Sequence, residues 1–113
     1  MAKPVIKWHA VESGGGRMAS VPDALPDLEP QQAFRRFELP LHLEWSRHDR
    51  QVNLKDRRER ARTYETVLRE GRPADIASVV DGALLVDLWE DLVLPRRVRA
   101  AWQPLIDGAI DGS

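Results

Sequence analysis

The chain has 113 residues and a mass of 12.9 kDa, which is the size of one ordinary domain. It contains no cysteine, and this excludes disulfides, thiolate metal sites and cysteine nucleophiles. The 17 basic and 18 acidic residues give a net charge of -1, so the molecule lacks the overall field that gathers nucleic acid or acidic lipid.

Hydropathy sets the expected compartment. No apolar run reaches the roughly 20 residues that are needed to cross a bilayer. Residues 1–7 also lack the apolar core of a signal peptide. We therefore expect a cytoplasmic protein with no membrane partner.

The N-terminal third is expected to hold one strand and a long loop. Residues 3–11 alternate, with Ile6 and Trp8 on one face and Lys7 and His9 on the other, which predicts a first strand. Three consecutive glycines from residue 14 are expected to end it. The stretch 12–33 is rich in glycine and proline, so we predict a flexible loop there.

A second strand has the clearest pattern in the chain. Five apolar residues alternate with polar ones and predict a half-buried strand over 37–45: Phe37, Leu39, Leu41, Leu43 and Trp45. Pro40 cannot donate to a ladder, which favours an edge position. Residues 51–55 read as a third strand with Val52 and Leu54 facing inward, and strands two and three are expected to form a hairpin.

The second half of the chain has the spacing of helices. Asp56 is a good N-cap for a helix that Gly71 ends. The next three helices are expected to begin at Pro73, Asp81 and Pro95. Pro104 predicts a kink or break in the last one. Strands followed by helices predict one α+β domain over 1–113, a small antiparallel three-stranded sheet packed against three to four C-terminal helices.

The best electrostatic feature is a run of arginines on the first turns of the helix that begins after Asp56. It consists of Arg57, Arg58, Arg60 and Arg62. Residues 47–73 carry nine basic and five acidic groups, whereas residues 74–95 carry five acidic groups and no basic one. The arginines could grip phosphate or an acidic protein surface, or they could only pair with neighbouring acids.

Histidine and carboxylate pairs are the weak candidates for chemistry. His42 and Glu44 share the polar face of the second predicted strand, and His9 on the first could join them as a zinc ligand or acid–base group. An exposed polar strand face is the competing interpretation. No HExxH-like spacing is present, so the sequence predicts no catalytic residue, no metal and no cofactor.

The stretch 37–106 resembles a known kind of sequence. The segments FELPLHLEWS, RTYETVLREG, VDGALLVDLWEDLVLP and VRAAW are similar to short, uncharacterised proteins of high-GC actinobacteria, often found on plasmids or transposable elements. This resemblance implies no activity and transfers no site residue.

Three functional hypotheses follow from these features. The first is a non-enzymatic cytoplasmic protein that binds another macromolecule, either a protein partner or a second copy of itself. The alternative is a nucleic-acid-associated regulator, antitoxin-like or encoded on a mobile element, that contacts phosphates through the arginines at 57–62. The third is a small hydrolase or nuclease that uses His42, Glu44 or His48.

Overall fold

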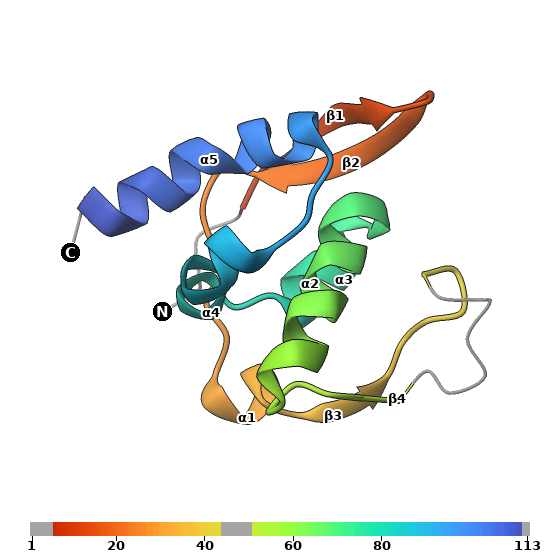
Figure 1. Ribbon diagram of the computed structural model, residues 1–113, viewed down its shortest axis with the longest axis vertical. Coiled ribbons are helices and arrows are strands. Elements are labelled where there is room, and N and C mark those ends of the chain that lie inside the picture. The colour runs from red at the N-terminus through yellow and green to blue at the C-terminus, as the bar shows by residue number, and fades with distance from the viewer. Residues whose placement is uncertain (1–5, 44–50, 112–113) are drawn as a thin grey trace.

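The fold is α+β and contains two small sheets. The computed structural model describes residues 6–43 and 51–111. These residues form two antiparallel sheets of two strands each, and the helices lie mostly in the C-terminal half. Figure 1 shows the first hairpin against helix α5 at one end of the molecule and the second hairpin at the other. The α+β class is confirmed, and the predicted three-stranded sheet is wrong because the strands divide between two sheets.

Strands β1 (Trp8–Gly14) and β2 (Arg17–Pro22) form the first hairpin, with Trp8 opposite Pro22. The turn is made by Gly14, Gly15 and Gly16, whose φ angles are 123°, 60° and 79°. Only glycine adopts such angles readily, so the triple glycine closes a hairpin and does not open a loop. The loop predicted over 12–33 is therefore corrected, since β2 and the short helix α1 (Pro30–Ala33) occupy much of that stretch.

Strands β3 (Arg36–Glu38) and β4 (Gln51–Asn53) pair as the second hairpin, as predicted, with Phe37 opposite Val52. The strand predicted over 37–45 is shorter than expected. It ends at Glu38, and the chain then turns, with the Leu43 amide donating to the Pro40 carbonyl at 3.0 Å. Leu39 and Leu43 are buried while Leu41 is 61% exposed. Trp45 lies outside the described residues.

The predicted helix starts agree with the structure. Helix α2 (Arg57–Glu70) begins after Asp56, whose carboxylate accepts from the amides of Arg58 and Glu59. Helix α3 (Pro73–Val79), helix α4 (Gly82–Leu88), the short 3-10 helix η1 (Trp89–Asp91) and helix α5 (Arg96–Asp111) follow. Helix α5 continues through Pro104, so the predicted break does not occur.

One cluster of buried side chains joins both hairpins to the helices. Ala19 and Val21 of β2 and Val52 of β4 belong to the same cluster as Tyr64 and Trp102, which are fully buried. The inward orientation predicted for Val52 and Leu54 is confirmed. No helix in the described part of the chain is long and apolar enough to span a bilayer.

Candidate functional site

The structure divides the arginine run into residues with different environments. Arg57 forms ion pairs with Asp91 at 2.9 Å and Asp87 at 3.4 Å, which links α2 to α4 and η1. Arg60 is only 6% exposed, and its Nη1 donates to the Leu54 carbonyl at 2.8 Å. Arg58 and Arg62 are exposed. Arg60 is buried and Arg57 already pairs with two acids. Of the four predicted arginines, Arg58 and Arg62 are therefore the ones best placed to bind a ligand.

The two histidine candidates in the described residues lie on separate elements. His42 hydrogen-bonds through Nε2 to Asp75 Oδ2 of α3 at 2.9 Å, and His9 lies exposed on β1. Burial acts to raise the pKa of Asp75, but hydrogen bonds from His42 and the Arg72 amide outweigh it and lower that pKa. Glu44 and His48 lie outside the described residues. Within 6–43 and 51–111, no group of three or more potential ligands could hold a metal ion.

A different arrangement centres on Asp81, at the start of α4. One oxygen of its buried carboxylate accepts from the Leu28 amide at 2.9 Å, and the other accepts from the Leu84 amide at 3.2 Å. Its own amide donates to the Tyr64 hydroxyl at 3.0 Å. The sequence predicts the capping role, but the bond to Leu28 spans 53 positions and has no local signal.

Gly82 completes this attachment by letting two backbones approach closely. Its amide donates to the Pro26 carbonyl at 2.7 Å. A Cβ at this position would lie 2.8 Å from both Leu25 Cβ and the Pro26 oxygen, closer than side-chain atoms normally come. Residues 24–28, which we name the clamp segment, are therefore held on the N-terminal end of α4 by Asp81 and Gly82 together.

An open groove of about 510 Å³ lies beside the clamp segment, and we name it the α4–α5 groove. Seven of its eight lining residues are apolar or glycine. They are Leu25 and Pro26 of the clamp segment, Gly82, Ala83 and Val86 of α4, and Ala109 and Ile110 of α5, with Asp27 as the eighth. A second groove, of about 490 Å³, shares Leu25, Pro26 and Asp27 and extends to Ile6 and Ala77. The clamp segment thus forms a ridge between two open grooves.

Helix α5 contributes an apolar face that extends beyond the core. Val98, Trp102 and Ile106 recur every four residues and are at most 1% exposed. Ile110 is the next residue in this series, but it is 55% exposed at the α4–α5 groove. Successive turns of a helix present neighbouring residues on one face. The same stripe that fills the core therefore leaves apolar surface exposed at the end of α5.

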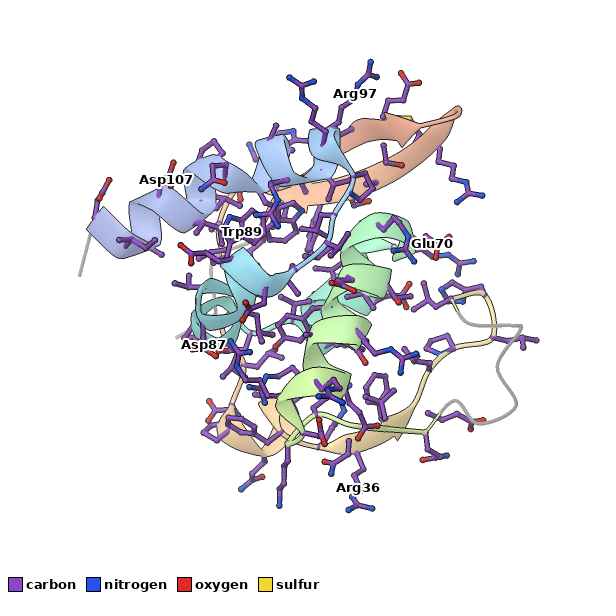
Figure 2. The ribbon with its side chains drawn as sticks, viewed as in Figure 1. Arg36, Glu70, Asp87, Trp89, Arg97 and Asp107 are labelled. Carbon is purple, nitrogen blue, oxygen red and sulfur yellow. The ribbon has the colours of Figure 1, made fainter. Side chains whose placement is uncertain are left out.

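Apart from Ile6, the residues that line the two grooves belong to acidic stretches of the chain. The stretches 18–34, 73–95 and 100–111 contain ten of the 18 acidic residues and no lysine or arginine. Figure 2 shows Asp87 of α4 and Asp107 of α5 on the same side of the molecule as the end of α5. Asp107 accepts from the Gln103 amide at 2.9 Å, and no lysine or arginine within 6–43 and 51–111 forms an ion pair with it. The sequence predicts the acidic block at 74–95, but not the other two acidic stretches beside it.

Comparison with protein-family models, curated proteins and solved structures found no match to this chain. The resemblance to short actinobacterial proteins stays a prediction. The geometry of the α4–α5 groove is thus the basis for interpreting function.

Proposed function

We propose that this chain is a small non-enzymatic cytoplasmic protein that binds another protein, and that the partner docks in the α4–α5 groove. The observation that supports it is the exposed continuation of the core stripe at Ile110, next to a groove lined almost entirely by apolar groups. Covering exposed apolar surface contributes about 25 cal/mol per Å² to association. Apolar patches bordered by polar residues are typical of interaction sites.

The attachment of the clamp segment to α4 supports the same proposal. The clamp segment is fixed to α4 by the Leu28–Asp81 and Gly82–Pro26 hydrogen bonds, so the groove does not have to be ordered when a partner arrives. A preformed surface loses less conformational entropy on binding than a disordered one.

Site-specific photocrosslinking tests this proposal. A photoreactive residue at Ala83 lies in the groove, whereas the same residue at Val93, which is 78% exposed and outside both grooves, is the matched control. We expect one discrete protein adduct from position 83 in a lysate of the producing cells and none from position 93. The purified partner should then bind the wild-type chain and the V93R variant, and it should not bind the A83R variant. Binding that A83R leaves unchanged would contradict docking at this groove.

The nucleic-acid alternative has narrower support, namely the two exposed arginines Arg58 and Arg62. Phosphate contacts require affinity to fall steeply as salt rises, with a logarithmic slope of roughly -0.9 for each phosphate neutralised on duplex DNA. Mobility-shift assays at two salt concentrations, on the wild type and an R58Q/R62Q variant, distinguish this alternative. If the wild type retards DNA and the R58Q/R62Q variant does not, the result would favour nucleic-acid binding over protein binding.

A further inference from the structure

We infer that the partner segment which occupies the α4–α5 groove is cationic and amphipathic, with an apolar face flanked by lysine or arginine. This inference rests on the proposed function and adds the chemistry of the partner. Three features carry it: the charge at the end of α5, the composition of the groove lining, and the sign of the charges on the surrounding segments.

The end of α5 is acidic in a position where acids are unfavourable. The C-terminal end of a helix carries a partial negative charge, which favours lysine or arginine in the last turn. Helix α5 has no basic residue there, and Asp107 and Asp111 stand four residues apart on one side of the helix. Like charges at this spacing also repel each other. Both effects are relieved when a partner places cations beside this turn.

The groove floor is built for an apolar side chain. Gly82, Ala83 and Ala109 have small or no side chains, and this leaves the open volume of about 510 Å³ between α4 and α5. Val86 and the half-exposed Ile110 supply apolar contact surface. A volume of this size falls within the usual range of binding pockets and accepts anchor side chains spaced along one face of a helix.

The charges around the groove disfavour the main competing occupants. Asp27 lines the groove. Asp87 lies one turn of α4 beyond Ala83, and Arg57 offsets part of its charge, so Asp27 is the main acid at the groove itself. A second copy docked by the same face would bring two acidic surfaces together, because a two-fold interface uses the same patch of both copies. Nucleic acid and anionic lipid are negatively charged, so the acidic residues around the groove repel them as well. A segment with basic flanks satisfies both the apolar floor and the acidic border.

Fluorescence anisotropy with a synthetic probe tests the inference. The probe is a labelled amphipathic peptide of about 18 residues, composed of leucine and lysine in a helical pattern. One comparison peptide replaces each lysine with glutamate, and another replaces each leucine with serine. We expect the leucine–lysine peptide to bind at least about tenfold more tightly than either, and its affinity to fall as salt rises.

Variants of the full chain locate the binding. D107N/D111N removes two charges from the last turns of α5, the same turns that line the groove through Ala109 and Ile110. We expect it to weaken binding of the leucine–lysine peptide about tenfold. E12Q/E70Q is the matched control, since it removes two exposed acids that pair with Arg97 and Arg17 elsewhere. Unchanged circular dichroism establishes that both variants fold. Equal weakening by the two double variants, or equal binding of the glutamate peptide, would overturn the inference.

The outcome for the partner class is separable from the outcome for the proposed function. A natural partner that crosslinks at position 83 while the leucine–lysine peptide fails to bind retains the proposed function and overturns the cationic inference. A concentration-dependent dimer that A83R abolishes in sedimentation experiments overturns it in favour of a second copy. Absence of both crosslink and peptide binding overturns the two together.

Discussion

Gly82 has a role at the residue scale that its place at the start of a helix does not suggest. Its backbone conformation is not unusual, and glycine is needed because Leu25 and Pro26 lie against its Cα. Apart from its chain neighbours and the backbone of its own helix, Gly108 of α5 has no atom within 4 Å of the position that a Cβ would take. The same substitution therefore has opposite consequences at the two sites.

Gly82→Ala should lower the free energy of unfolding by about 1–3 kcal/mol, because the added methyl forces the clamp segment away from α4. Gly108→Ala should raise it by about 0.5–1 kcal/mol, because alanine is the better helix former. Urea denaturation of the two variants measures both changes. Equal shifts of the two midpoints would show that the close approach at Gly82 has no energetic consequence.

Tyr64 is the single tyrosine of the chain, so its ionisation can be followed without interference. Burial raises its pKa to about 12 from the ordinary value of 10.0. In the unfolded chain the phenol ionises first, so the stability tied to Tyr64 is complete below pH 10 and is lost as pH rises toward 12.

Phenolate absorbance of the folded protein should stay flat through pH 10 and rise only near pH 12, or earlier if the chain unfolds first. Far-ultraviolet circular dichroism at each pH identifies unfolding. The Tyr64→Phe variant is the blank for the absorbance, and it should lose about 1–3 kcal/mol of stability because the Asp81 amide no longer has an acceptor. A midpoint near 10 in folded protein would contradict the burial of this hydroxyl.

At the scale of elements, local signals predicted the helices well and the strands less well. Asp56, Pro73 and Asp81 mark helix starts by chemistry contained within a few residues, and the structure agrees. The pairing of β1 with β2 depends on a turn in which every glycine has positive φ, and three glycines in sequence are equally typical of a linker. Composition alone therefore suggested a loop where a hairpin forms.

The α4–α5 groove was harder to predict from the sequence than the strands were. Its three walls come from residues 25–27, α4 and the end of α5, which are distant in the sequence and meet only in the folded chain. The apolar stripe of α5 was predictable, because Val98, Trp102 and Ile106 follow helical spacing. The exposure of Ile110 was not predictable, because it depends on how far the packed core extends along α5.

Pro104 lies inside helix α5, where the backbone geometry of a helix disfavours proline. A proline inside a helix removes one backbone hydrogen bond and crowds the preceding turn, at a cost of about 3 kcal/mol. Pro104 is exposed, so its ring contributes little packing that would offset this cost. At the first position of α3, by contrast, Pro73 has the φ angle that a helix start requires.

Pro104→Ala should therefore raise the free energy of unfolding by about 1–2 kcal/mol, after allowing for the greater entropy of the unfolded variant. Pro73→Ala should lower it by up to about 1 kcal/mol. Thermal melts of the two variants give the signs. A loss of stability in Pro104→Ala would mean that the proline ring packs usefully in α5.

On the scale of the whole molecule, the two hairpins lie at opposite ends and share one core. Helix α5 lies along β1 (Figure 1). The Arg97–Glu12 ion pair of 3.1 Å joins them at the surface. Arg99 lies over the ring of Trp89 at 4.7 Å, and Trp89 donates to Gln103. These contacts connect α5 with η1, and the buried cluster extends from β2 to β4 without interruption. A continuous core of this kind should unfold as one unit.

Leu88→Ala removes a fully buried side chain in α4 and should cost about 2–5 kcal/mol. Because the core is shared, its effect should reach β1 as well as the helices. Fluorine NMR of the protein labelled with fluorotryptophan follows Trp8 in β1 and Trp102 in α5 separately during urea unfolding. We expect both signals to move to lower urea by the same amount in Leu88→Ala. If Trp102 moved while Trp8 kept its wild-type midpoint, the first hairpin would be an independent unit, and the clamp segment would connect two bodies instead of forming one wall of a rigid groove.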